Sequence, residues 1–276
     1  MKMTLGFSPC PNDTFIFDAL VNKKIDTEGI EFELFLEDVQ TLNQWSIENR
    51  LDISKISYGV YPLLLGHYDL LDSGGALGQG VGPLLIAGKP MLQPDIRGLK
   101  VAIPGQNTTA HVLFSLAFPD SQNKAFMIFS AIEDAILRGH VDCGVIIHEN
   151  RFTYQQKGLF KWMDLGAYWE MQTGLPIPLG GIVMKKTIDS EMQQKVNRLI
   201  RNSIEYAFAK YPQLGNFVKN NSQEMEESVM RQHIDLYVND YSLSLGEQGK
   251  KAIDFFVKVY NSMGKPNAQP FSLAGL

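Results

Sequence analysis

Cysteine is scarce in this chain of 276 residues, which contains only Cys10 and Cys143. Neither belongs to a pair with metal-ligand spacing or to a disulfide framework of the kind that small secreted proteins use. The His-Glu-x-x-His, Gly-x-Ser-x-Gly, Gly-x-Gly-x-x-Gly and phosphate-binding-loop patterns are absent as well. These absences argue against zinc, hydrolase and nucleotide-dependent chemistry. We therefore expect a protein of a reducing compartment that works with no cofactor and no metal.

Runs of positive charge and long apolar runs are also missing. The formal net charge is −5, whereas a nucleic-acid-binding surface needs clustered positive charge. The amino terminus lacks the apolar core of a signal peptide, and no later segment approaches the ~18 apolar residues that span a bilayer. The sequence predicts a cytoplasmic protein that binds a small-molecule substrate, with no nucleic acid and no membrane as partner. The residues leave the oligomeric state open, a homodimer included.

The residues that are present have the composition of a folded protein, with 45% hydrophobic and 20% charged side chains. Short apolar runs alternate with segments of helical period, which favours an α/β fold with mainly parallel sheets. The carboxyl-terminal third is expected to be helical. The predicted strands are 3–7, 30–35, 51–56, 84–87, 99–103, 125–129, 141–147 and 182–184. The predicted helices before that third are 39–49, 109–118 and 131–138.

Two similar segments of the sequence, each running from a helix into a strand, indicate two related lobes. The alternative is that two helix–strand units are similar by chance. Residues 45–54 and 135–144 each end a helix and open a strand after a short turn and an aspartate. Gly and Pro break the periodicity at 88–98 and near 175–181, which indicates two crossings between the lobes. The predicted division is residues 1–89 plus 183–276 for lobe 1 and 90–182 for lobe 2, with a ligand cleft between them.

Four junctions at which an apolar strand ends are candidate ligand sites. In an open α/β sheet the ligand crevice lies outside the carboxyl ends of the strands, where helix amino termini present free N–H groups to anions. The first junction, residues 8–14, carries the consecutive polar residues Asn12, Asp13 and Thr14. These either cap the following helix or also contact a ligand.

The second and third junctions offer hydroxyl groups. In residues 52–59, Ser57 either donates to a carboxylate or carbonyl of a ligand or caps a helix, and Lys55 is either a solvated charge or an attractor of anions. In residues 104–110, paired threonines that include Thr109 can cap the next helix and still offer hydroxyls to a small anion.

The fourth junction holds His148, which follows the apolar run that begins at Cys143. An imidazole titrates at about pH 6.5, so a histidine at the mouth of a cleft is a candidate for proton transfer. The other histidines, at positions 67, 111, 140 and 233, lack the combination of apolar strand, abrupt polar ending and charged turn. A lone histidine is more often structural, and the residues alone leave both interpretations open.

Taken together, four segments resemble the 1,4-dihydroxy-6-naphthoate synthase family of menaquinone biosynthesis by the futalosine pathway. They read SPCPNDTFIF at 8–17, SKISY at 54–58, PGQNTTA at 104–110 and IHENRFTY at 147–154. The resemblance covers essentially the whole chain and implies a two-lobed fold like that of type 2 periplasmic binding proteins. It also implies a carbon–carbon lyase that converts cyclic dehypoxanthine futalosine to 1,4-dihydroxy-6-naphthoate and dihydroxyacetone without a cofactor.

The resemblance assigns roles to individual residues by motif. His148 corresponds to the general base. Two segments correspond to substrate contacts, namely Lys55, Ile56 and Ser57 in one and Thr109 and Ala110 in the other. Asn12 is added to the predicted site from the position of its junction.

One position departs from the family pattern, which has glycine where this chain has Asn150. Asparagine tolerates left-handed backbone angles, so the turn after His148 is expected to persist. Two other functions fit the same fold. One is chorismate dehydratase of the same pathway, and the other is a non-enzymatic small-anion binding protein.

Overall fold

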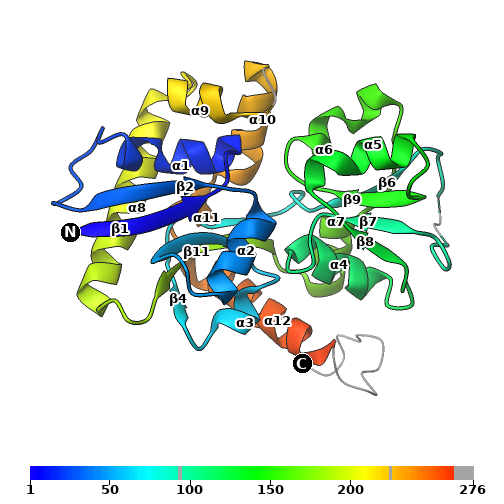
Figure 1. Cartoon of the computed structure of the whole chain (residues 1–276), viewed down its shortest axis with the longest axis horizontal. Coiled ribbons are helices and arrows are strands. Elements are labelled where there is room, and N and C mark those ends of the chain that lie inside the picture. Colours follow the sequence, from blue (N-terminus) through cyan, green and yellow to red (C-terminus); the bar gives the residue numbers. More distant parts are fainter. Residues whose placement is uncertain (93–94, 224–225, 264–276) are drawn as a thin grey trace.

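Two β-sheets lie side by side in the molecule, each flanked by helices (Figure 1). The computed structural model describes residues 1–92, 95–223 and 226–263. We call the part built on the first sheet lobe 1 and the part built on the second sheet lobe 2. Lobe 1 contains both the amino-terminal strands and the long carboxyl-terminal helices, so the chain leaves it and returns. This two-sheet α/β architecture agrees with the predicted fold class.

The first sheet has the strand order β2-β1-β3-β11-β4, and β5 pairs with β11 beyond this path. Strand β1 runs parallel to β2 and β3, whereas β11 runs antiparallel to β3, β4 and β5. The strand bounds are β1 Lys2–Phe7, β2 Glu31–Leu36, β3 Ile53–Ser57, β4 Tyr68–Leu70, β5 Ala76–Gly78 and β11 Ile177–Lys185.

The second sheet has the order β10-β6-β9-β7-β8. Strand β7 runs parallel to β8 and β9, and β6 runs antiparallel to β9 and β10. The bounds are β6 Leu84–Ala87, β7 Val101–Ile103, β8 Lys124–Phe126, β9 Cys143–Ile146 and β10 Phe160–Asp164. Both sheets are therefore mixed, and the prediction of mainly parallel sheets is wrong. Strands β11, β6 and β10 run antiparallel to their neighbours. The direction of a strand cannot be predicted from a pattern of apolar residues.

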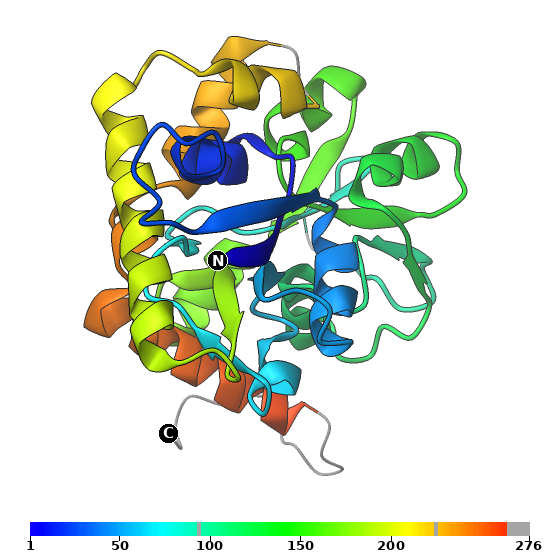
Figure 2. The same ribbon diagram turned by 60° about the vertical axis from the view of Figure 1, so that its left-hand side comes forward.

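Helices lie beside both sheets and bury their apolar faces (Figure 1). The apolar face of α8, which includes Val196, Leu199 and Ile200, is buried, and α8 packs against α1. Figure 2 shows α8 as the yellow helix along one side of lobe 1. The long helices are α1 Pro11–Val21, α2 Val39–Ile47, α4 Thr109–Ala117, α7 Leu165–Thr173, α8 Ser190–Lys210, α10 Glu227–Tyr237 and α12 Gly246–Ser262. The short ones are α3 Tyr61–Leu64, α5 Ile132–Leu137, α6 Asn150–Thr153, α9 Asn216–Asn221, α11 Asp240–Leu243 and the 3-10 turns η1 Phe129–Ala131 and η2 Tyr154–Lys157.

The carboxyl-terminal third is helical as far as the structure describes it, as predicted. Among the described residues, no helix combines the length and apolar character that a membrane crossing requires. The predicted helices and strands correspond to observed elements, with ends that differ by a few residues. The strands β4, β5 and β10 are short or half-exposed and were not predicted.

The strand pairing corrects the predicted lobe boundaries. Residues 84–87 were assigned to lobe 1, but β6 pairs with β9 and β10 and so belongs to the second sheet. The segment Ile177–Lys185 was divided between the lobes, whereas β11 lies wholly in the first sheet. The Gly/Pro run at 88–98 follows β6 and leads to β7, so it connects two strands of one sheet. The first crossing lies earlier, at 79–83, where Gly and Pro also interrupt the pattern.

The two similar segments of the sequence correspond to one repeated turn. Helices α2 and α5 are each followed by a left-handed residue, Asn49 with φ 55° and Gly139 with φ 70°. The following aspartate then fixes the start of a neighbouring strand. Asp52 Oδ2 accepts a hydrogen bond from the Thr4 backbone nitrogen at 2.9 Å, and Asp142 Oδ2 accepts one from that of Lys100 at 2.7 Å. The two units therefore use the same local geometry in both lobes.

Candidate functional site

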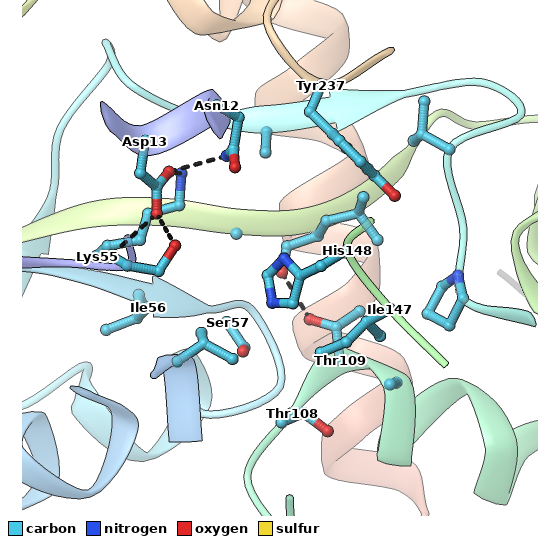
Figure 3. A pocket seen from close by; sticks show the side chains of 18 of the residues that line it. Asn12, Asp13, Lys55, Ile56, Ser57, Thr108, Thr109, Ile147, His148 and Tyr237 are labelled. Atoms are coloured by element: carbon cyan, nitrogen blue, oxygen red, sulfur yellow. Dashed lines mark hydrogen bonds and ion pairs between the residues drawn. The ribbon is translucent and has the colours of Figure 1, made fainter. Parts of the chain in front are cut away.

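A cavity of about 90 Å³ lies where the two lobes meet (Figure 3). It is lined by all seven residues that the sequence predicts, namely Asn12, Lys55, Ile56, Ser57, Thr109, Ala110 and His148. His233 and Tyr237 also line it and were not predicted, and so does Asp13, which the first junction offered as a cap or a ligand contact. Pockets for drug-sized ligands usually measure ~300–1,000 Å³. The lobes are therefore close together, and a larger ligand must part the walls.

A buried ion pair forms one wall of the cavity. Lys55 Nζ lies 2.9 Å from Asp13 Oδ1, with only 6% and 2% of the two side chains exposed. The ammonium also donates to the Gly74 carbonyl at 3.1 Å. Asp13 Oδ2 accepts from the Ser8 hydroxyl at 2.8 Å and from the Ser8 backbone nitrogen at 3.2 Å. Lys55 is thus not a solvated charge, since a carboxylate in the first turn of α1 already neutralises it.

The first junction does not cap its helix in the predicted way. The N-cap of α1 is Cys10, whose side chain makes no capping hydrogen bond. Asn12 lies in the first turn, donates from Nδ2 to Asp13 Oδ1 at 2.9 Å, and shares a 2.9 Å hydrogen bond between its Oδ1 and His233 Nε2. Its amide therefore connects the ion pair on α1 to a histidine on α10.

Asn43 joins the second and third junctions and was not predicted. Its Oδ1 accepts from the Ser57 backbone nitrogen at 2.9 Å, and its Nδ2 donates to Ser57 Oγ at 3.1 Å. The same Nδ2 donates to the carbonyl of Asn107 in lobe 2 at 3.0 Å. One amide on α2 thereby positions Ser57 and connects the two lobes.

The amino terminus of α4 faces the cavity. Thr108 is its N-cap and accepts from the His111 backbone nitrogen at 3.2 Å, as the capping interpretation predicts. The Thr109 hydroxyl donates to the carbonyl of Leu179 at 2.8 Å and accepts from the backbone nitrogen of Gly59 at 3.1 Å. The first backbone N–H groups of a helix have no partner within the helix, so those of α4 suit an anion.

The approach of the two lobes at this point depends on glycine. A Cβ atom on Gly59 would lie 2.4 Å from the backbone carbonyl carbon of Thr108. Such a contact is far inside van der Waals distance, so any larger residue would push α4 away from β3. Close contact between the lobes therefore requires a residue without a side chain here.

His148 lies just beyond the end of β9, as predicted, and its side chain points into the cavity (Figure 3). Its backbone is left-handed, with φ 56°, a conformation that is uncommon for residues other than glycine and clusters at functional sites. The ring packs on Phe129 at 4.8 Å and stacks on His233 at 6.2 Å between centroids. Its Nδ1 lies 3.5 Å from Sγ of Cys10 in lobe 1.

Burial controls the charge of His148. It lowers the pKa of this imidazole to about 4, and the nearby Lys55 ammonium acts in the same direction. The carboxylates of Asp13 and Asp38 act in the opposite direction. The ring is therefore neutral at pH 7 and able to accept a proton.

The left-handed residue of this turn was expected at position 150, but it lies at position 148. Asn150 begins α6 and donates from Nδ2 to Glu133, while the left-handed angle belongs to His148 itself. A glycine at position 150 is thus not required for the turn. Trp169 is fully buried in a core with Phe255 and Phe256 and does not line the cavity.

His233 was set aside in the sequence because no apolar strand precedes it. It lies instead on the buried face of α10, four residues before Tyr237 and beside Met230 and Ile234. A histidine and a tyrosine spaced at i and i+4 on an otherwise apolar helix face are the signal that would have identified this wall.

Among the described residues, one group has atoms close enough to share a metal ion. These are Cys10, His148 and Glu149, whose candidate ligand atoms all lie within 4.8 Å of one another. Burial and the Glu149 carboxylate raise the pKa of the Cys10 thiol well above its ordinary value. The protonated thiol is a poor ligand, because metals bind the thiolate.

Comparisons with known proteins agree on one family. A family model described as menaquinone biosynthesis matches residues 3–262. A 1,4-dihydroxy-6-naphthoate synthase from Thermus thermophilus is 42% identical over 251 residues, which cover 91% of each chain. The match therefore includes both lobes and all four motifs.

Solved structures agree on the fold. A protein from Archaeoglobus fulgidus superposes with a TM-score of 0.90 and 30% identity, covering 95% of this chain and 98% of that one. The alkanesulfonate-binding protein of Xanthomonas axonopodis superposes with a TM-score of 0.71 at 13% identity, covering 95% of this chain and 93% of its own. The second likeness shows that the chain has the architecture of periplasmic binding proteins.

Proposed function

The chain belongs to the 1,4-dihydroxy-6-naphthoate synthases, enzymes of menaquinone biosynthesis, and from this membership we propose that its cavity cleaves cyclic dehypoxanthine futalosine. The products are 1,4-dihydroxy-6-naphthoate and dihydroxyacetone. The observation that supports this most strongly is a neutral histidine held at the meeting point of the lobes. Formation of the aromatic naphthoate favours the cleavage direction.

His148 is the general base of this reaction. We assign the proton of the neutral ring to Nδ1, which lies 3.5 Å from Sγ of Cys10 and donates to it in this tautomer. The unprotonated nitrogen is then Nε2, on a ring that lines the cavity. It removes a proton from the substrate and so starts carbon–carbon cleavage. The Asp13 and Asp38 carboxylates stabilise the imidazolium that forms.

The substrate carboxylate fits the opposite wall. The amino terminus of α4 offers the backbone N–H groups of Thr109 and Ala110, and Ser57 offers a hydroxyl from β3. These neutral donors bind an anion without a full positive charge nearby, because Asp13 already neutralises Lys55. The residues from both lobes hold the substrate only when the lobes are close together. Closure also excludes water, which strengthens the electrostatic interactions inside the site.

Turnover by His148→Ala tests this proposal. General-base assistance contributes ~10²–10⁴ in rate, so we expect kcat to fall by about that factor while substrate affinity changes little. His67→Ala is the matched control, since His67 is exposed and distant from the cavity motifs. Each protein is incubated with cyclic dehypoxanthine futalosine, with naphthoate absorbance recorded, and separately with chorismate, with the loss of chorismate recorded.

Three results would overturn the proposal. Near-normal turnover by His148→Ala would show that His148 is not the general base. Conversion of chorismate by the unaltered enzyme, with no naphthoate from the futalosine derivative, would support the dehydratase instead. Tight binding of the derivative without turnover would support a binding protein.

A further inference from the structure

The charge network around the cavity fixes the proton of His233. Lys55 is paired with the Asp13 carboxylate, and a carboxylate only accepts, so the contact from Asn12 to Asp13 must be made by the amide nitrogen. The amide oxygen of Asn12 therefore faces His233 Nε2, 2.9 Å away. An oxygen can only accept here, so Nε2 carries the hydrogen. His233 is fixed as one tautomer, with Nδ1 as a bare acceptor.

This acceptor is not used by the part of the chain that the structure describes. Among the described residues, His233 Nδ1 is a buried atom with no hydrogen-bond partner. A buried polar atom without a partner destabilises the folded state, and native structures retain few of them. Nearly the whole side chain is buried, with 1% of its surface exposed. Burial also lowers the pKa of this imidazole well below its ordinary value, assisted by His148 and Lys55, so the ring does not gain a proton instead.

The ring lines the cavity and stacks on His148, with 6.2 Å between centroids and 12° between planes. Because the cavity is only about 90 Å³, a bound substrate must displace its walls, and this ring is one of them. Tyr237, on the next turn of α10, lines the same side. His233 therefore belongs to the wall that a bound substrate displaces.

We propose that His233 is a substrate-binding residue whose Nδ1 accepts a hydrogen bond from a substrate hydroxyl. This inference rests on the proposed function and names the part of the substrate that is held. The three-carbon unit released as dihydroxyacetone is the hydroxyl-bearing part, whereas the naphthoate part presents a carboxylate that needs donors. A neutral acceptor beside the base orients the three-carbon unit toward His148, while the α4 terminus holds the acidic end.

Two variants distinguish the binding of substrate by His233 Nδ1 from the hydrogen bond that His233 Nε2 makes to Asn12. His233→Gln places an amide nitrogen near the position of Nε2, so it keeps the donor to Asn12 and loses the acceptor. His233→Asn places a carbonyl oxygen near the position of Nδ1, so it keeps the acceptor and loses the contact with Asn12. His67→Asn controls for the change of residue type, since His67 is exposed.

We expect a crossed result from thermal melting and steady-state kinetics. His233→Gln keeps a melting temperature near that of the unaltered enzyme, but its KM rises about tenfold, the effect of one lost hydrogen bond. His233→Asn melts at a lower temperature but keeps KM within about threefold. The reverse pattern, or a normal KM for His233→Gln, overturns the inference.

Substrate analogues make the test independent of whether His233→Asn folds. Each analogue of cyclic dehypoxanthine futalosine lacks one hydroxyl of the three-carbon unit. For the analogue without the hydroxyl that contacts His233, the unaltered enzyme and His233→Gln should have equal kcat/KM. If the tenfold difference persists for every analogue, the contact does not exist. Turnover of the intact substrate by the unaltered enzyme tests the proposed function itself, so the two failures are distinct.

Discussion

Replacing Asp13 with asparagine tests the charge balance on which the site depends. The asparagine would keep a side-chain oxygen that accepts from Ser8, but its amide nitrogen would face Lys55 and Asn12, so the substitution removes the charge together with the acceptor for those two groups. The partner ammonium of Lys55 would then be buried without a counter-charge, with 6% of its side chain exposed. Its carbonyl contact with Gly74 is a dipole and cannot replace a carboxylate.

The size of the effect follows from that burial. Removing one partner of a buried ion pair costs ~3–5 kcal/mol, because the other charge is left uncompensated. In the variant, Lys55 can become neutral by releasing its proton. The free energy of that release is the upper limit of the loss of stability. An ordinary lysine titrates at about pH 10.4, and each pH unit corresponds to about 1.4 kcal/mol, so the upper limit is about 5 kcal/mol at pH 7 and about 2 kcal/mol at pH 9. The loss of stability should therefore shrink as pH rises.

The measurement is the free energy of unfolding in urea for Asp13→Asn relative to the unaltered protein at pH 7 and pH 9. Lys55→Met in the Asp13→Asn background should restore much of the stability, since it removes the stranded charge. Asp95→Asn is the control, because the Asp95–Arg97 pair is exposed and should contribute little. A loss below about 1 kcal/mol at pH 7, or one that does not change with pH, would refute the reasoning.

Three further predictions concern the cavity. Because the pKa of His148 is about 4, its imidazole stays neutral at higher pH, and kcat/KM should fall on acidification with a midpoint near 4; a midpoint near 6.5 would contradict the assigned base. Cys10→Ala should lower kcat about tenfold by freeing Nδ1 of His148, with Cys10→Ser less affected because its hydroxyl can still accept; equal rates for the two variants would contradict this. Asn43→Ala should cost ~1–3 kcal/mol in urea unfolding, since it leaves the buried Ser57 nitrogen unpaired, and it should raise KM by loosening the lobes; an unchanged midpoint and KM would refute the bridging role.

The sequence predicted those parts of the fold that depend on local pattern. The apolar runs gave β1 and β9, and helical spacing gave α8, because each buries a continuous face. Strand direction was not predictable in this way. Strand β11 reads as an apolar segment whether it runs parallel or antiparallel, and only the return of the chain to the first sheet decides.

The candidate site shows the same limit. Motifs placed His148 and Thr109 at the ends of strands, and both line the cavity. Asn43 and His233 lie on helices far from those motifs in sequence, and only the packing of α2 and α10 brings them in. Asp13 was considered as a cap or a ligand contact, and its pairing with Lys55 was not predicted, because residues on different strands and helices share no local spacing.

The contact between Cys10 and His148 joins the two lobes, since Cys10 precedes α1 and His148 follows β9. Separation of the lobes would break it, and the His148 proton could then move between the two ring nitrogens. His148 would therefore be ready to abstract a proton only while the two lobes are closed. An empty, open enzyme would have no defined base, and the movement that releases the products would also switch off proton abstraction, which protects other metabolites that enter the cleft briefly.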